Sequence, residues 1–214
     1  MSELVKRVLT GISLLTILIY SILYAPFWIF PALVTLILGI ILFTEWPRLF
    51  DYKRPFFWLM LPYLLVPFFL ISILHLEGYR LLNFLLICMV AAHDTGSYFV
   101  GKRWGKYKIV PTISPRKTWE GFIGGCSATF LVAVLFFTFQ QLPSFAFLFL
   151  FSLTVSTLAF LGDIFESYLK RKAHIKDSGT ILPGHGGLLD RIDSMMFVVI
   201  FIYFMRKVLW SFLL

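Results

Sequence analysis

The segment SYLKRKAHIKDSGTILPGHGGLLDRIDS, residues 167–194, separates two strongly apolar stretches and holds much of the chain's charge-rich chemistry. Lysines, arginines, aspartates, histidines and glycines are concentrated within it. A plain linker needs only polarity and length, whereas this segment ends in Gly184-His185-Gly186-Gly187 and then Asp190-Arg191-Ile192-Asp193. We therefore expect the segment to carry function and the apolar stretches around it to build the fold.

The composition predicts an integral membrane protein. Hydrophobic residues make up 59% of the 214 and charged residues only 14%, and apolar runs of membrane-spanning length recur along the chain. We expect an all-α fold: one integral membrane domain, residues 1–214, forming a polytopic bundle of about seven transmembrane helices with cytoplasmic catalytic loops. The predicted spans are residues 8–24, 29–44, 56–74, 81–100, 122–139, 145–161 and 194–214, the first two of which could also form one re-entrant pair.

The charge distribution predicts orientation and the kind of partner. All lysines and arginines except Arg80, Arg206 and Lys207 fall at the amino terminus or in alternate loops, which the positive-inside rule places in the cytoplasm. The net charge of +8 lies beside membrane segments rather than on a soluble basic domain. Membrane lipids or an anionic substrate therefore fit better than nucleic acid. Cys88 and Cys126 lie within apolar runs without disulfide or zinc spacing.

Carboxylates at two predicted helix ends suggest a metal site. Asp163 and Glu166 are three residues apart and share a helix face with Lys170, while Asp190 and Asp193 are three apart at the start of the last span. Closely placed carboxylates near an apolar medium need a cation, and Mg²⁺ is typically held by one or two carboxylates, water and substrate phosphates. The alternative is that these acids form interfacial salt bridges with neighbouring basic side chains.

Two polar loops could hold a phosphate. Gly186 and Gly187 let backbone amides approach a ligand closely, and His185 could donate to a phosphate or act as an acid or base, although a loop histidine is more often an ordinary hydrogen-bonding residue. The other loop, residues 101–121, is cationic with interleaved aromatics, as is usual for a membrane anchor. An anchor does not account for the hydroxyl and basic side chains at its end, which are Ser114, Arg116, Lys117 and Thr118.

An ionisable pair lies inside the fourth predicted span. His93 and Asp94 are costly there unless they face a polar cavity or a partner. A structural hydrogen bond is a credible role for His93. Because the small residues Thr95, Gly96 and Ser97 follow Asp94, we expect Asp94 to line a cavity.

These motifs resemble those of the phosphatidate cytidylyltransferases, also called CDP-diacylglycerol synthases. The resemblance covers residues 92–194, which carry the catalytic motifs, and extends to the amino-terminal LVKRVLTG at residues 4–11. It rests on Ser167, Lys170-Arg171, Lys176-Asp177, the Gly184 loop and Asp190-Arg191-Ile192-Asp193, together with HDTGSY at 93–98 and SPRKTWEG at 114–121. Typical bacterial members carry more helices before the Asp94 block than residues 45–80 can supply.

The resemblance implies CMP transfer from CTP to phosphatidate, giving CDP-diacylglycerol and pyrophosphate, in a bacterial inner membrane. It implies Mg²⁺ held by Asp163, Asp190 and Asp193, and leaves open a second cation and a homodimer. The expected catalytic residues are Asp163, Lys176, Asp177, His185, Asp190 and Arg191. The expected substrate-binding residues are Asp94, Ser114, Arg116, Lys117, Thr118, Lys170, Arg171, Gly186 and Gly187.

Three other functions stay open at this point. A CTP-dependent kinase of a polyprenol or similar lipid alcohol would release CDP instead of pyrophosphate. A transporter would use His93 and Asp94 as a proton relay, but its polar residues would lie near the middle of the membrane rather than at one face. A shortened, inactive relative would only bind partners, against which the complete set of acids argues.

Overall fold

The computed structural model describes residues 3–138, 142–181 and 186–213. Helices dominate this part of the chain, which contains no strand, and Lys108 and Thr118 form an isolated bridge. The helices are α1 (Glu3–Leu23), α2 (Ile29–Ile40), α3 (Trp46–Leu49), α4 (Pro55–Leu76), α5 (Arg80–Trp104), α6 (Trp119–Thr138), α7 (Phe145–Lys172) and α8 (Met195–Trp210). A π-helical turn, η1 (Ile41–Glu45), joins α2 to α3, and a 3₁₀ turn, η2 (Leu189–Arg191), precedes α8. The predicted all-α class is confirmed.

Helices long and apolar enough to cross a bilayer recur along the chain. Within the described residues five qualify: Ile29–Leu49, Pro55–Leu76, Arg80–Trp104, Trp119–Thr138 and Phe145–Lys172. The apolar part of α1 covers only Gly11–Leu23, and α8 has 16 residues. The chain is therefore a multi-pass membrane protein, whereas the exact number of seven spans stays a prediction. The second span extends beyond its expected end at residue 44 and includes Glu45.

The chain divides into two compact units. Unit 1 comprises Met1–Phe84 and Tyr168–Asp193, and unit 2 comprises Leu85–Ser167 and Ser194–Leu214. The boundaries fall inside α5 and α7, so each of these helices contributes to both units. The candidate residues are thereby divided: Lys170 and Asp190 belong to unit 1, and Lys117 and Asp163 belong to unit 2.

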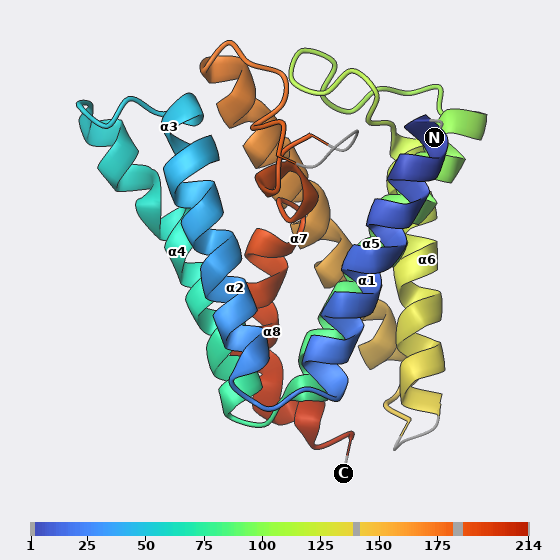
Figure 1. Ribbon diagram of the computed structural model, residues 1–214. Coiled ribbons are helices and arrows are strands. Elements are labelled where there is room, and N and C mark those ends of the chain that lie inside the picture. Colours follow the sequence, from blue (N-terminus) through green and yellow to red (C-terminus); the bar gives the residue numbers. More distant parts are fainter. Residues whose placement is uncertain (1–2, 139–141, 182–185, 214) are drawn as a thin grey trace. The chain divides into compact units, whose positions relative to one another are not determined.

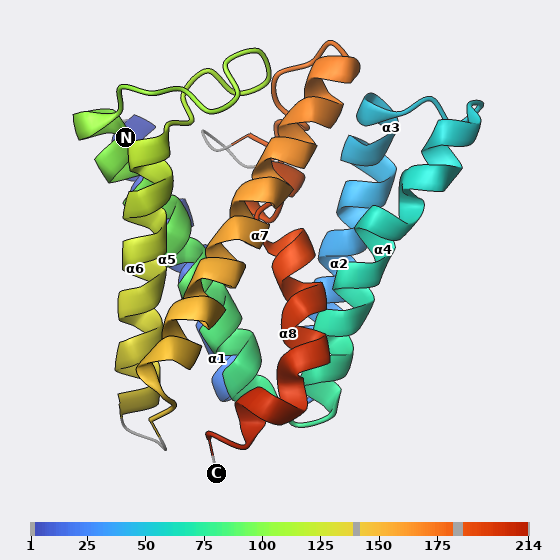
Figure 2. The ribbon, with the colours of Figure 1, turned by 180° about the vertical axis from the view of Figure 1, so that it is seen from behind.

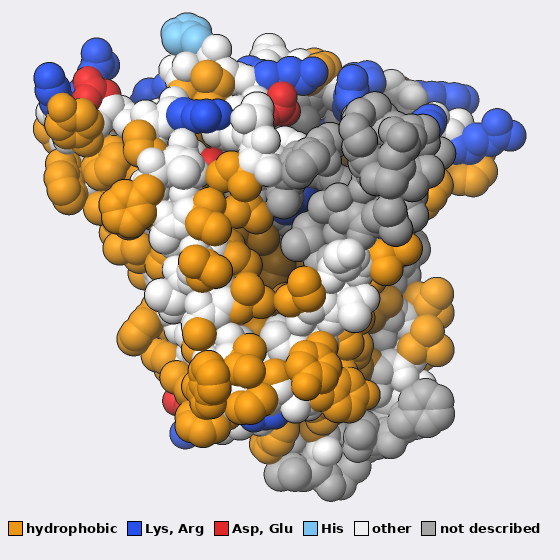
Figure 3. Space-filling view, viewed as in Figure 1, with side chains coloured by type: hydrophobic (Ala, Val, Ile, Leu, Met, Phe, Trp, Pro, Cys, Tyr) orange, Lys and Arg blue, Asp and Glu red, His pale blue; other side chains and the backbone are white. Residues whose placement is uncertain are grey.

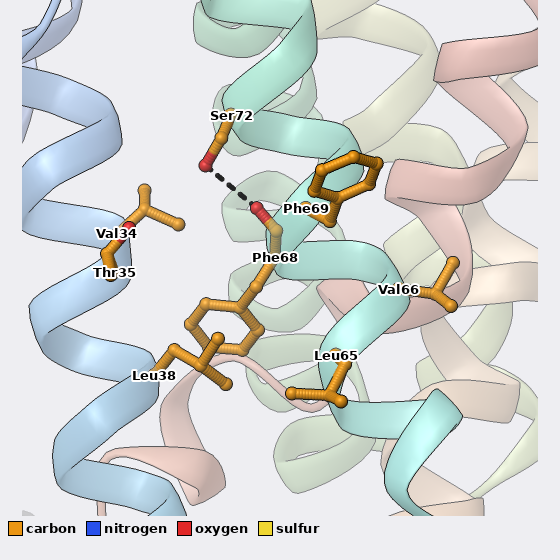
Figure 4. Close-up of a pocket in the computed structure, with 8 residues that line it drawn as sticks. All are labelled: Val34, Thr35, Leu38, Leu65, Val66, Phe68, Phe69 and Ser72. Atoms are coloured by element: carbon orange, nitrogen blue, oxygen red, sulfur yellow. Dashed lines mark hydrogen bonds between the residues drawn. The ribbon is translucent and has the colours of Figure 1, made fainter.

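In unit 1, α2 lies beside α4 (Figures 1 and 2). Trp46 is fully buried, with its ring centroid 4.6 Å from that of Phe50. A groove of about 440 Å³ lies between α2 and α4 and is lined mainly by apolar side chains, among them Leu38, Leu65 and Phe69 (Figure 4). Its two hydroxyl side chains, Thr35 and Ser72, each donate to a carbonyl of their own helix, Pro31 and Phe68 respectively, so the groove wall is largely apolar.

The outer flank of unit 1 has the surface of a membrane protein. The exposed side chains along α4 are apolar, and Lys and Arg gather at the end where α3 and α4 meet (Figure 3). Trp58, Leu59 and Phe69 are each more than 60% exposed, which suits contact with lipid chains. Arg54 at the start of α4 is 80% exposed, which suits contact with headgroups.

In unit 2, small residues bring α5 and α6 close together. A Cβ atom added at Gly96 would lie 2.7 Å from the Gly124 carbonyl oxygen and 2.8 Å from the Cβ of Ala128. The buried Thr129 hydroxyl of α6 lies 3.4 Å from the Met89 carbonyl of α5. Without a hydrophobic driving force between helices in lipid, such close backbone contact is a main source of association. The backbones of α5 and α6 are therefore packed closely against each other at these residues.

Hydroxyl side chains define two helix starts in unit 2. The Thr118 Oγ1 accepts a hydrogen bond of 3.1 Å from the Gly121 amide at the start of α6. The Ser144 Oγ accepts one of 3.3 Å from the Phe147 amide at the start of α7. Each satisfies an amide that has no partner within its helix. The cap at Thr118 fixes the point where the cationic loop ends and α6 begins.

Candidate active site

The first candidate cluster is a buried ion pair in unit 1. Lys170, in the last turn of α7, places its Nζ 2.7 Å from Oδ1 of Asp190, which lies in η2. Only 11% and 9% of these two side chains are exposed. A buried pair of this kind requires good geometry and further hydrogen bonds to offset the loss of hydration. The end of a membrane-spanning helix is thus tied to the segment that precedes α8.

The further hydrogen bonds to Asp190 come from the backbone. The Ser178 amide donates to both carboxylate oxygens, at 3.2 and 3.1 Å, and the Gly187 amide donates to Oδ2 at 2.9 Å. Burial raises the pKa of Asp190, but the hydrogen bond and charge of Lys170, with the two amides, outweigh it, so the pKa lies below its usual value. Asp190 is therefore held as a carboxylate.

The same segment is held from its other side by Glu45, the last residue of η1. Glu45 is fully buried and accepts hydrogen bonds from the Ser178 hydroxyl, at 2.9 Å, and from the amides of Leu188 and Leu189, at 2.7 and 2.8 Å. Sequence reasoning missed this residue. The signal was a single acid within an apolar span, which by itself suggests function, but the span was predicted to end one residue earlier.

The second candidate cluster is an ion pair in unit 2. The Lys117 Nζ lies 2.6 Å from Oδ2 of Asp163, and the Ser167 hydroxyl donates to Oδ1 of Asp163 at 3.3 Å. The same Nζ lies 4.7 Å from the ring centroid of Phe160. The exposed fractions are 15% for the Lys117 side chain and 33% for that of Asp163. This pair joins the cationic loop to α7 and leaves part of the carboxylate accessible.

Other predicted residues of unit 2 take varied positions. Asp94 is exposed and accepts a hydrogen bond of 3.2 Å from the Ser194 hydroxyl. Thr118 is 3% exposed because its side chain caps α6. Arg116 is exposed and Ser114 is half-buried in the loop before α6. Their roles in substrate binding stay predictions.

The remaining predicted residues of unit 1 lie mostly at the surface. The side chains of Arg171, Lys176, Asp177 and Arg191 are exposed, and the Arg171 guanidinium donates to the Ile175 carbonyl at 3.1 Å. The predicted glycines and metal ligand are placed as follows: Gly186 is half-buried with φ +85°, Gly187 is buried, and Asp193 is 7% exposed. His185 lies outside the described residues.

The resemblance implies that Asp163, Asp190 and Asp193 hold a metal ion. Among the described residues no group of three or more histidine, cysteine, aspartate or glutamate side chains forms a metal cage. Mg²⁺ does not require such a cage, because substrate phosphates and water normally complete its coordination. The carboxylate oxygens of these residues are suitable ligands for it. Of the two acids that pair with a lysine, Asp163 is more exposed than Asp190.

The fold and these two clusters define a class: a multi-pass helical membrane protein in which lysine–aspartate pairs join α7 to the polar segments before α6 and α8. The model of the Cytidylyltransferase family matches residues 55–209, which include both pairs. The chain belongs to this family.

Curated relatives with similar sequences include three bacterial proteins, each described as a phosphatidate cytidylyltransferase. The one from Rickettsia conorii (strain ATCC VR-613 / Malish 7) is 34% identical over 218 residues, covering 96% of this chain and 92% of the relative. That from Bacillus subtilis (strain 168) is 48% identical over 139 residues, covering 64% and 52%. That from Staphylococcus haemolyticus (strain JCSC1435) is 48% identical over 123 residues, covering 56% and 46%. The matched part therefore spans about half of the last two relatives and nearly all of the first.

Proposed function

We propose that this protein transfers CMP from CTP to phosphatidate, producing CDP-diacylglycerol and pyrophosphate. The observation that carries the proposal is the family match over residues 55–209, which contains Lys117, Asp163, Lys170 and Asp190. The relative from Rickettsia conorii, matched over 92% of its length, has the corresponding name. A membrane-embedded helical fold is also the setting in which a diacyl lipid substrate is found.

The chemistry suits a protein that positions charge rather than one that forms a covalent intermediate. A phosphate oxygen of phosphatidate attacks the α-phosphorus of CTP, a new P–O bond forms, and the bond from the α-phosphorus to the bridging oxygen of pyrophosphate breaks. The nucleophile is already an anion, so no general base is needed. Catalysis then rests on alignment and on neutralising the charge that accumulates on the leaving pyrophosphate.

Basic side chains would supply this neutralisation. Lys117 and Lys170 each face a carboxylate, which holds the ammonium groups in place before substrate arrives. The exposed Arg171, Lys176 and Arg191 could reach an incoming triphosphate. In the cationic loop, Ser114 and Arg116 would bind either the triphosphate or the lipid phosphate. Asp177 would orient a lysine or contact the nucleotide.

Mg²⁺ would be held by Asp163, Asp190 and Asp193, and when bound it would offset negative charge on the CTP phosphates. The protein's own contribution is to keep these carboxylates ionised. For Asp190 that contribution is visible in the lysine and the two amides that stabilise its charged form. A second cation and a homodimer belong to the proposal as open variants.

The active site would face the cytoplasm of a bacterial cell, with the protein in the inner membrane. CTP is a cytoplasmic metabolite, and the loops richest in Lys and Arg are the expected cytoplasmic ones. The proposal therefore places the cationic loop and the segment after α7 on the side where the nucleotide is found.

The test is an assay of purified protein in detergent and phosphatidate mixed micelles with CTP labelled at the α-phosphorus. The expected result is label in the lipid extract, stoichiometric release of pyrophosphate, and loss of both on chelation of Mg²⁺ or omission of phosphatidate. Release of CDP with a lipid alcohol as acceptor would instead identify a lipid kinase. Absence of label transfer under all these conditions would overturn the proposal.

A further inference from the structure

Glu45 is a fully buried acid whose hydrogen-bond donors come from a distant part of the chain. It is 0% exposed and ends a π-helical turn, a feature that inside an α-helix often marks a functional position. It lies in the amino-terminal half of the chain, outside residues 55–209 that match the family. Burial of a carboxylate within an apolar span is costly unless hydrogen-bond donors surround it.

Those donors all come from one distant segment. The Ser178 hydroxyl and the amides of Leu188 and Leu189 donate to the two carboxylate oxygens, over 133 to 144 residues of sequence separation. The backbone approaches unusually closely, because a Cβ atom added at Gly179 or Gly187 would lie 2.7 or 2.9 Å from Oε1 of Glu45. The approach therefore depends on glycine at both positions.

Two carboxylates share the segment between them. The Ser178 amide donates to Asp190 while its hydroxyl donates to Glu45, and the successive amides of residues 187, 188 and 189 donate to Asp190, Glu45 and Glu45. Ser178, Leu188 and Leu189 are thus all held by Glu45, and Asp190 follows Leu189 directly. Movement of Glu45 would be transmitted to Asp190 through Ser178 and the backbone.

We propose that Glu45 is a positioning residue for CMP transfer: its carboxylate holds Ser178 and the amides of Leu188 and Leu189, and so places Asp190 and its ion pair with Lys170. This inference rests on the proposed function. Glu45 acts through the segment and is not required to touch substrate. The amino-terminal half of the chain thereby contributes to the site through one side chain.

The test compares Glu45→Gln and Glu45→Asp. Glutamine keeps the size but turns an NH₂ donor toward groups that are themselves donors, whereas aspartate keeps both acceptor oxygens on a shorter side chain. We expect kcat to fall roughly 10- to 100-fold in Glu45→Gln, as for loss of other supporting hydrogen-bond partners, with the KM for phosphatidate unchanged. Glu45→Asp should recover part of this loss. Asp51→Asn also replaces a carboxylate by an amide, but at an exposed acid of the same unit. It serves as the matched control and should keep wild-type kcat.

Deuterium uptake supplies a readout that does not depend on turnover. In Glu45→Gln, peptides covering residues 186–192 should exchange faster, while peptides from α6 and α8 stay as in the wild type. If Glu45→Gln does not fold, Ser178→Ala removes only the hydroxyl donor and should show the same exchange change with a smaller fall in kcat.

The outcomes separate this inference from the proposed function. Wild-type protein that transfers no CMP would overturn the function, yet faster exchange at residues 186–192 in Glu45→Gln would still support the role of Glu45 in fixing the segment. Unchanged exchange and unchanged kcat in Glu45→Gln would overturn the inference even if the wild type is active. A uniform rise in exchange across all helices would also overturn it, because that result would show a general structural role.

Discussion

The two lysine–aspartate pairs differ in how firmly the fold holds them. Lys170–Asp190 in unit 1 is almost fully buried, and its carboxylate also accepts hydrogen bonds from the amides of Ser178 and Gly187. Lys117–Asp163 in unit 2 leaves 33% of the aspartate side chain exposed, with a serine hydroxyl as its further donor. The distances between the lysine Nζ and the aspartate Oδ atoms are alike, at 2.7 and 2.6 Å. The two pairs differ in burial and in the number of further hydrogen-bond donors to the carboxylate.

This difference suggests a division of labour. Asp190 is bound by so many fixed donors that its position is a property of the fold, and replacing it should disturb folding as well as activity. Asp163 has fewer donors and more exposure, so its partners can change when a cation or phosphate arrives. The following predictions test whether the buried pair supports both folding stability and activity, and whether the exposed pair supports activity alone.

The largest effect is expected for Asp190→Asn. The change leaves the Lys170 ammonium buried opposite a neutral amide, and breaking a buried pair typically costs about 3–5 kcal/mol of folding free energy. CMP transfer should fall by a factor of ~10² or more as well. Unfolding in detergent and label transfer from CTP measure the two effects. Wild-type stability in this variant would contradict the view that the pair supports the fold.

Asp163→Asn should lower activity with little effect on stability. Loss of its charge removes a predicted cation ligand and should reduce label transfer by ~10²-fold. Because the carboxylate is one-third exposed, the ion pair with Lys117 should contribute only about 0–1 kcal/mol. The same two assays apply. A stability loss as large as that of Asp190→Asn would remove the distinction between the pairs.

Gly96→Ala tests the close contact between α5 and α6 in unit 2. The added methyl group would collide with the Gly124 carbonyl and Ala128, and overpacking of this kind costs typically about 1–3 kcal/mol. Gly39→Ala in α2 is the matched control, because nothing lies within 4 Å of a Cβ atom there. Unfolding measured in detergent should show destabilisation only for the first. Equal stability of the two variants would show that the α5–α6 contact is not tight.

The smallest effect concerns pH. The pKa of Asp190 is lowered in the folded protein, so the unfolded state binds its proton at a higher pH, and stability rises with pH over that interval. The contribution is therefore complete above the ordinary aspartate value of 3.8 and is lost as the pH falls through the lowered pKa. Stability of the wild type should fall more steeply below that value than stability of Asp190→Asn. Parallel curves would contradict the shift.

The sequence predicts the helices well because a bilayer requires long apolar runs. The spacing also predicts that Asp163 and Asp190 lie beside basic residues, and each of them pairs with a lysine. The actual pairings do not follow from spacing, since Lys170 was predicted to share a face with Asp163 and Glu166, yet its hydrogen bond with Asp190 depends on how residues 173–189 fold. Glu45 was missed for the same reason: its partners lie more than 130 residues away, and only the folded chain brings them together.

The exposed basic residues show a further limit. Spacing could place Lys176 and Arg191 in the functional segment, but their positions relative to a triphosphate depend on a bound ligand. Thr118 shows the reverse case, because its sequence context suggests phosphate binding and its side chain is used to cap α6. Local patterns identify residue types suited to a reaction, and long-range hydrogen bonds decide which of them are held in place.

The most direct test of the central claim is α-phosphorus label transfer from CTP to phosphatidate in wild type, Asp163→Asn, Asp190→Asn and the double variant. The claim is that both aspartates serve one CMP-transfer step. The prediction is formation of labelled CDP-diacylglycerol by the wild type, a loss of ~10²-fold or more in each single variant, and no multiplication of the losses in the double variant, as for residues that act as a unit. Losses that multiply, or a wild type that leaves the lipid unlabelled, would contradict it.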